Sequence, residues 1–254
     1  MNTVGIDVGT RFVKTSVVRD GKLLGSSIDE IKKSIYQVIS DSYRRARRQA
    51  GINRFRVDRL ASTGFGAELV RRSLSTSQEL CMVRAAQAFD PSVRTVIDIG
   101  SLFIRIASVD ENGRVLDSCV NEKCAAGSGR FLEMIADTLG IPVAQISEVA
   151  ASSGEPFKFS NGCAVFAESE IISELNKGRK GADILAGMIR AIASKIQTLV
   201  ERLQAKGPFA LIGGVANVSF LQTALGEILG APIVSAPLSP QLMLSYGAAL
   251  VASE

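Results

Sequence analysis

Apolar and polar positions alternate in short runs over the first 26 residues, and tight-turn residues separate the runs. An apolar strand ends in Asp-x-Gly, an alternating strand follows, and Asp20-Gly21 comes next, a pattern that predicts a β-hairpin followed by a second turn. The pattern returns 91 positions later, where IDIGSLFIRIASVDENGR (97–114) aligns with IDVGTRFVKTSVVRDGK (6–22). A duplicated hairpin predicts two similar domains that face each other.

Segments with helical spacing of apolar residues alternate with further short strands. Expected helices cover 28–50, 80–89, the segment with Phe131, Leu132, Ile135 and Leu139 on its apolar face, the segment from Ala164, 181–205, the segment up to Leu229, and the chain from Pro240. Expected strands cover 57–63, 114–120, 209–217 and 233–234, and the turn at 63–66 is expected to open another helix. This alternation indicates an α/β fold, with a domain boundary near 90–94.

The two hairpin turns carry groups suited to phosphate. Gly9 and Gly100 can adopt backbone angles that are closed to other residues. The amides of Gly9-Thr10 and Gly100-Ser101 can therefore approach a phosphate closely, with a hydroxyl beside them. Asp7 and Asp98 stand at the strand ends, where they could hold hydrated Mg²⁺ or orient a water. This paired arrangement resembles the phosphate loops of the actin, sugar kinase and heat-shock chaperone ATPase superfamily.

A glycine pair late in the chain adds to this site. Gly213-Gly214 follows an apolar strand and opens a helical segment that includes Asn217. Glycine at such a turn either meets the backbone demand of a strand-to-helix connection or lets the backbone approach a flat or charged ligand group. Beside two phosphate turns, the second interpretation places the adenosine of ATP here.

Composition narrows the possible chemistry. The 254 residues are 46% apolar, enough for one large or two small globular domains. No apolar run reaches membrane-spanning length and the strand pattern begins at once, so we expect a cytoplasmic protein with no membrane partner. The chain has no histidine, which excludes His-based acid–base catalysis, catalytic triads and His-ligated zinc.

Seven arginines gather within a short segment, although the net charge is only +4: Arg44, Arg45, Arg47, Arg48, Arg54, Arg56 and Arg59. They suit either a solvated helix end and loop or a docking site for an acidic partner. Little aromatic interleaving accompanies them, so we expect no nucleic-acid partner.

Two of the four cysteines stand just before apolar-faced helices. Cys124 opens CAAGSGRFLEMI and Cys163 opens CAVFAESEII, so each thiolate would feel the positive end of a helix dipole. A cubane iron–sulfur cluster needs four thiolates, which a two-fold dimer would supply. Buried structural cysteines and a one-chain site that uses all four cysteines are the alternatives. Cys81 lies in a helix pattern and Cys119 in a strand pattern, which favours core packing for both.

Five segments together carry a closer resemblance: GIDVGT, NEKCAAGSGRFLEM, NGCAVFAESEIIS, LIGGVAN and SYGAALVA. Over nearly the whole chain the sequence resembles the activator ATPases of 2-hydroxyacyl-CoA dehydratases and the related ATP-hydrolysing subunits of benzoyl-CoA reductase. The resemblance implies an actin-like ATPase fold of two duplicated ribonuclease H-like domains around a nucleotide cleft. The first domain would comprise 1–92 with the last helix, about 238–254, and the second 93–237.

The resemblance also implies a function. It indicates a cytoplasmic, oxygen-sensitive homodimer that uses ATP hydrolysis to pass one low-potential electron to an iron–sulfur dehydratase or reductase. Cys124 and Cys163 of both chains would hold one 4Fe-4S cluster, and a ferredoxin or flavodoxin would supply the electron. ATP or ADP with Mg²⁺ would bind the residues of the two turns and their surroundings: Asp7, Gly9, Thr10, Arg11, Lys14, Asp98, Gly100, Ser101, Gly127, Ser128, Gly129, Arg130, Gly213, Gly214 and Asn217.

The chain departs from the family pattern in both turns. Thr10-Arg11 stands where the family usually has a hydroxyl pair, and Ser101-Leu102-Phe103 stands where it usually has Gly-Gln-Asp. Met82 follows Cys81, where the family commonly has histidine. Two other functions therefore stay open: a small-molecule kinase on the same fold, which would not need Cys124 or Cys163, and a degenerate nucleotide-binding regulator.

Overall fold

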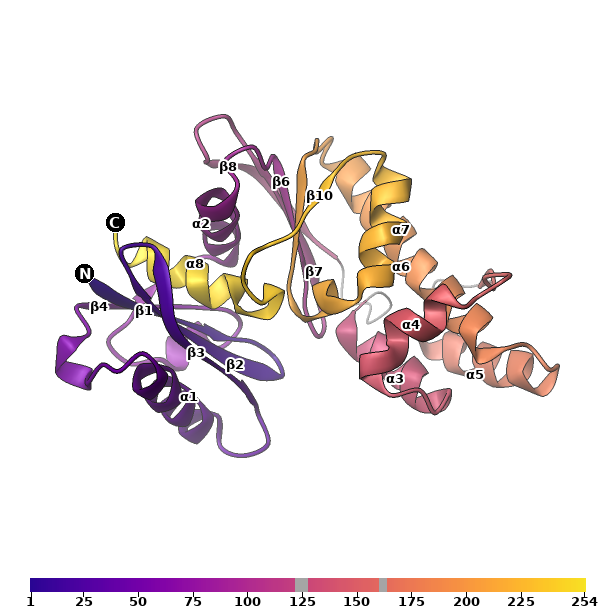
Figure 1. Ribbon diagram of the computed structural model, residues 1–254, viewed down its shortest axis with the longest axis horizontal. Coiled ribbons are helices and arrows are strands. Elements are labelled where there is room, and N and C mark those ends of the chain that lie inside the picture. Colours follow the sequence, from indigo (N-terminus) through magenta and orange to yellow (C-terminus); the bar gives the residue numbers. More distant parts are fainter. Residues whose placement is uncertain (122–127, 160–163) are drawn as a thin grey trace.

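Two five-stranded sheets form the frame of the protein (Figure 1). The computed structural model describes residues 1–121, 128–159 and 164–254, without the side chains of 164–167. The strands of the first sheet are β1 (Asn2–Val8), β2 (Phe12–Arg19), β3 (Lys22–Glu30), β4 (Arg59–Thr63) and β5 (Leu74–Ser75). Those of the second sheet are β6 (Thr95–Ile99), β7 (Ile104–Val109), β8 (Val115–Val120), β9 (Phe209–Ile212) and β10 (Ile233–Val234).

The two sheets repeat one topology. The first has the order β3-β2-β1-β4-β5 and the second the order β8-β7-β6-β9-β10. In each, three antiparallel strands are joined by hairpins and two further strands run parallel to the first. The predicted duplication is therefore confirmed. Asp20 and Gly21 both have positive φ, 50° and 76°, as a two-residue hairpin turn requires.

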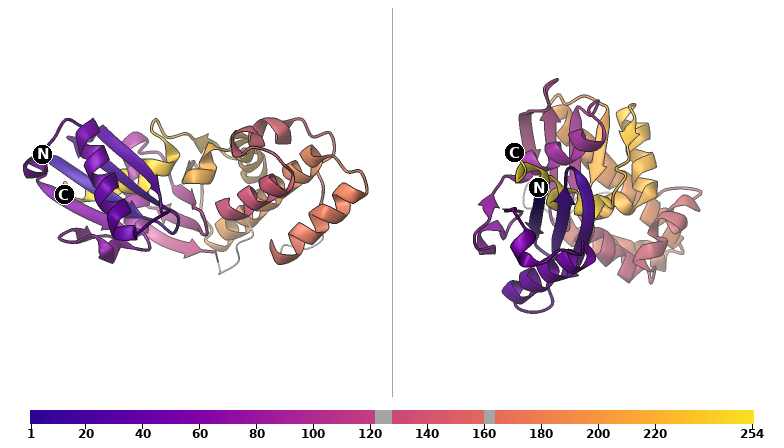
Figure 2. Two further views of the ribbon diagram at one scale, coloured as in Figure 1. Left: turned by 90° about the horizontal axis from the view of Figure 1, so that it is seen from below. Right: turned by 60° about the vertical axis from the view of Figure 1, so that its left-hand side comes forward.

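The helices differ between the copies. They are α1 (Ile35–Gln49), α2 (Gln78–Phe89), α3 (Gly129–Thr138), α4 (Ile146–Ala151), α5 (Ala164–Asn176), α6 (Gly181–Arg202), α7 (Ser219–Leu229) and α8 (Met243–Val251). In the first copy α1 and a 3-10 turn, Arg54–Arg56, connect β3 to β4, whereas α3 to α6 all lie between β8 and β9. Figure 2 shows α3, α4 and α5 projecting from the second sheet, away from the first. No helix in the described ranges is long and apolar enough to cross a membrane.

The last helix of each copy packs in the space between the sheets. Helix α8 packs on β1, β2 and β4, whereas α2 packs on β6, β7 and β8, and the two helices contact each other. Together they bury one apolar cluster with residues from both sheets. The approach is closest at Gly247, where an added Cβ would lie 1.9 Å from the carbonyl oxygen of Cys81. This packing fixes the two hairpins relative to each other.

Several predicted boundaries were wrong. The helix expected over 28–50 begins only at Ile35, because β3 continues to Glu30 and Ile28 pairs with Lys14 of β2. The segment after Gly66 forms one 3-10 turn, Ala67–Leu69, and the strand expected over 209–217 ends at Ile212. Helix α4 and strand β5 were not predicted. Cys81 is buried in α2, and Cys119 packs half-buried on β8, in agreement with the core positions expected for them.

Candidate functional site

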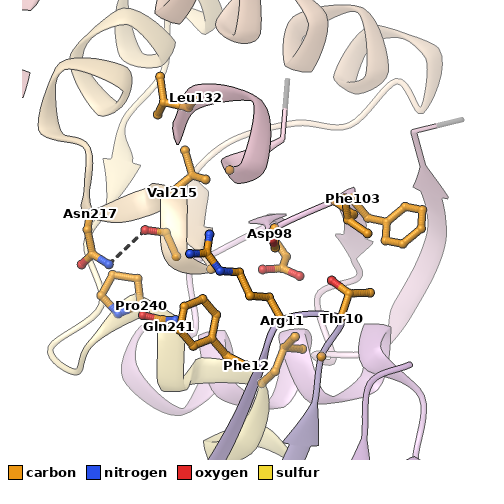
Figure 3. Close-up of a pocket in the computed structure, with 18 of the residues that line it drawn as sticks. Thr10, Arg11, Phe12, Asp98, Phe103, Leu132, Val215, Asn217, Pro240 and Gln241 are labelled. Carbon is orange, nitrogen blue, oxygen red and sulfur yellow. Dashed lines mark hydrogen bonds between the residues drawn. The ribbon is translucent and has the colours of Figure 1, made fainter. Parts of the chain in front are cut away.

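A cavity of about 510 Å³ lies between the two hairpin turns, lined by both halves of the molecule (Figure 3). Twelve of the residues singled out in the sequence line it: Asp7, Gly9, Thr10, Arg11, Lys14, Asp98, Gly100, Ser101, Gly129, Gly213, Gly214 and Asn217. Ser128 is buried beside the cavity lining and Arg130 is exposed. Gly127 and both expected cluster ligands, Cys124 and Cys163, lie outside the described residues.

The first hairpin holds a buried ion pair. Asp7 at the end of β1 faces Lys14 in the register of β2, and Lys14 Nζ donates to Asp7 Oδ2 at 2.9 Å. Their side chains are 3% and 14% exposed, respectively. Because breaking a buried pair leaves one charge uncompensated, Lys14 and Asp7 hold each other at the cavity wall.

The second hairpin repeats this geometry with a different pairing. Asp98 of β6 stands opposite Arg105 of β7, as Asp7 stands opposite Lys14. The Arg105 guanidinium, however, donates to Glu79 of α2. Burial of Asp98, together with the negative charge of Asp7, raises its pKa to about 6. A cation bound in the cavity would therefore stabilise the ionised form of Asp98.

Each carboxylate rests against a glycine. Gly64 follows β4 with φ +91°, and a Cβ there would lie 2.4 Å from Asp7 Oδ1. Gly213 follows β9 with φ +89°, and a Cβ there would lie 2.4 Å from Asp98 Oδ1. Only glycine meets both the backbone angle and the close approach at these positions. The sequence pattern predicted Gly213 as part of the site and Gly64 only as part of a turn.

The second turn is bonded to the start of α3. Gly129 N donates to Gly100 O and Arg130 N donates to Ser101 O, both at 3.0 Å. The first amides of a helix have no partner within it, so these bonds satisfy two of them. The two bonds therefore attach the second turn to the first residues of α3.

One side of the cavity is apolar. Leu132 of α3, Val143, Ile146 of α4, Val215 and Pro240 line it, and Asn217 Nδ2 donates to Gly214 O at 3.0 Å (Figure 3). Such a wall beside a few polar groups suits a flat, partly apolar ligand group. Residues 143–146 were not predicted as part of the site, because the sequence pattern indicates no helix or strand there.

The comparison with known families decides the identity of the fold. The model of the BadF/BadG/BcrA/BcrD ATPase family matches residues 4–252. The chain belongs to this ATPase family. Among its relatives, the (R)-2-hydroxyglutaryl-CoA dehydratase activating ATPase of Acidaminococcus fermentans is 35% identical over 260 residues, covering 98% of this chain and 96% of that protein.

Two further comparisons agree. The 2-hydroxyisocaproyl-CoA dehydratase activator of Clostridioides difficile is 31% identical over 253 residues, with 99% and 95% of the two chains covered. A solved structure of the 2-hydroxyisocaproyl-CoA dehydratase activator from Clostridium difficile with bound ADPNP superposes with a TM-score of 0.92 at 30% identity, covering 99% of this chain and 94% of that one. The actin-like ATPase fold predicted from the sequence is therefore confirmed.

In this BadF-type ATPase the departures in the two turns face the cavity, whereas Met82 is buried between the sheets. Arg11, Leu102 and Phe103 line the cavity, together with Phe65, whose surface is 80% exposed. The second turn thus presents apolar side chains where the family pattern has polar ones. Contacts from this turn to a polar ligand can therefore come only from its backbone and from Ser101.

Two charged residues of the cavity were missed in the sequence analysis. Arg105 could have been found, because the duplication aligns it with Lys14. Glu133 of α3 gives no such signal: its role depends on an ion pair with Arg11, which is 122 positions away in the chain.

Proposed function

We propose that this ATPase couples ATP hydrolysis to the transfer of one low-potential electron to an iron–sulfur partner enzyme. The observation that carries the proposal is the pair of duplicated turns, which set two buried carboxylates, Asp7 and Asp98, against one cavity. The names of the two relatives, both activators of CoA-ester dehydratases, support a partner of the 2-hydroxyacyl-CoA dehydratase type, and the sequence resemblance extends the proposal to the benzoyl-CoA reductase type.

The polar end of the cavity suits the phosphates and Mg²⁺. Backbone amides of the two turns, Thr10, Ser101 and Lys14 would contact the phosphate oxygens. Asp7 and Asp98 would hold hydrated Mg²⁺ or orient the attacking water, and carboxylate oxygens are ligands that this cation prefers. No group of three potential metal ligands is found among the residues the structure describes, but Mg²⁺ bound through phosphates and one or two carboxylates needs none.

The opposite end of the cavity suits adenosine. Gly213, Gly214 and Asn217 would border it, and the apolar wall formed by Val215 and its neighbours would cover one face of the base. ATP would thereby contact both halves of the protein. We propose that these halves are 1–92 with 238–254, and 93–237.

Coupling follows from differential binding. A nucleotide shifts a conformational equilibrium only by its difference in affinity for the two states. Gly100 and Ser101 contact α3 through backbone hydrogen bonds, so a ligand that moves the second turn also moves this helix. We propose 127–130 as the connection between the nucleotide and the cluster ligands.

The electron would come from a ferredoxin or flavodoxin in the cytoplasm. Cys124 and Cys163 of two chains would hold one 4Fe-4S cluster, which supplies reversible one-electron chemistry at low potential. The chain's own part is to offer two thiolates on either side of a dimer axis and to tie them to the nucleotide site.

Anaerobic purification tests the proposal. We expect about four irons and four sulfides per two chains, as one cubane requires, together with ATPase activity that is lost in Asp7→Asn. Cys124→Ser and Cys163→Ser should each lose the iron, whereas Cys119→Ser, a cysteine on β8, should keep it. An iron-free anaerobic preparation would refute the electron-transfer role, and ATPase activity unchanged in Asp7→Asn would refute the assigned site.

A further inference from the structure

Arg11 spans the cavity. Its side chain leaves the turn between β1 and β2 and extends toward the opposite wall (Figure 3). Arg11 Nε lies 3.1 Å from Glu30 Oε1, at the end of β3 in the same sheet. Arg11 Nη1 pairs with Glu133 Oε2 on α3, which belongs to the other half of the molecule. One guanidinium therefore joins the first phosphate turn to the helix that is hydrogen-bonded to the second.

Glu133 and a bound phosphate would compete for the guanidinium of Arg11. Glu133 lines the same cavity as Asp7 and Asp98, so an entering triphosphate would meet three carboxylates. Hydrogen bonding to Glu133 raises the pKa of Arg11, which keeps the guanidinium fully charged. Carboxylate and phosphate both fit the planar fork of arginine. A phosphate near the first turn and the carboxylate of Glu133 would thus draw on the same donors.

We propose that Arg11 is a phosphate-sensitive latch: without nucleotide it ties the first turn to α3 through Glu133, and a bound triphosphate takes the guanidinium from Glu133 and releases α3. The latch rests on the proposed nucleotide site. Nucleotide binding and opening of the Arg11–Glu133 pair are thermodynamically linked. The closed pair therefore weakens nucleotide affinity by the same factor by which bound nucleotide weakens the pair.

A double-mutant cycle tests the latch. The dissociation constants of Mg²⁺-ADPNP and Mg²⁺-ADP are measured by calorimetry for the unmodified protein, Glu133→Gln, Arg11→Gln and the double variant. A partly exposed ion pair contributes up to about 1 kcal/mol. We therefore expect Glu133→Gln to tighten ADPNP binding about fivefold. In the Arg11→Gln background the same change should have less than a twofold effect. Asp137→Asn, an exposed carboxylate on the same helix, is the control and should leave affinity unchanged.

Hydrogen exchange in α3 provides a second measurement. ADPNP should raise exchange over 131–138 in the unmodified protein, whereas Glu133→Gln and Arg11→Gln should show the raised exchange without nucleotide. If Glu133→Gln changes ADPNP affinity equally with and without Arg11, the change reflects long-range charge repulsion and the latch is overturned. No change in ADPNP affinity in either background would also overturn it. Failure of the unmodified protein to bind ADPNP would instead refute the nucleotide site itself, and the latch with it.

Discussion

Asp98→Asn should make the nucleotide-free protein more stable at neutral pH while abolishing its ATPase activity. Burial and the charge of Asp7 raise the pKa of Asp98 from 3.8 to about 6. A raised carboxyl pKa means that ionisation destabilises the folded state: the cost is absent below pH 3.8 and complete above about pH 6. At about 1.4 kcal/mol per pKa unit, a shift of roughly two units costs about 3 kcal/mol. The asparagine variant carries no such cost.

Urea unfolding followed by far-UV circular dichroism, in Mg²⁺-free buffer, measures this gain. At pH 8 the free energy of unfolding of Asp98→Asn should exceed that of the unmodified protein by up to about 3 kcal/mol, and at pH 4 the difference should fall below about 1 kcal/mol. Asp137→Asn controls for the loss of one surface charge. A variant that is less stable at pH 8, or equally stabilised at pH 4, would show that the cavity does not strain Asp98 in the way described.

Three further predictions concern single residues. Gly213→Ala puts a Cβ 2.4 Å from Asp98 Oδ1 and should lower kcat/KM for ATP at least tenfold. The control Gly230→Ala, with φ +58° and open space around it, should cost only about 1 kcal/mol of stability. Equal activity in both variants would contradict the role of Gly213. Burial raises the pKa of Cys81 to about 12, so iodoacetamide at pH 8 should label Cys119 before Cys81 in the native protein. Mass mapping that finds Cys81 labelled first would contradict this prediction. Gly247→Ala should lower the free energy of unfolding by about 3 kcal/mol, because its Cβ would lie 1.9 Å from a carbonyl oxygen of α2. An unchanged melting temperature would rule out this tight packing.

The parts of the site that lie in the duplicated hairpins could be predicted from the sequence. Asp7 and Asp98, each followed by a glycine turn, could be found because duplication makes a short motif recognisable. Gly213 could be found because its glycine pair follows an apolar strand in a chain that already has two phosphate turns. The resemblance then predicted the fold, which the family match and the solved structure confirm.

Other parts depended on tertiary contacts. Ile28 has helical spacing with the residues that follow it, yet pairing with β2 keeps it in a strand. Glu133 looks like a residue on the solvent face of α3, and only the approach of Arg11 across the cavity gives it a role. The cluster assignment of Cys124 and Cys163 stays a prediction from sequence, because both lie outside the described residues.

We propose that nucleotide and cluster are coupled through this chain. The most direct measurement is the rate at which bathophenanthroline disulfonate extracts iron from the reduced, anaerobic protein without nucleotide, with Mg²⁺-ADP and with Mg²⁺-ATP. We predict that Mg²⁺-ATP changes this rate severalfold relative to Mg²⁺-ADP, and that Asp7→Asn removes the difference. An extraction rate that is the same in all three conditions would contradict the coupling.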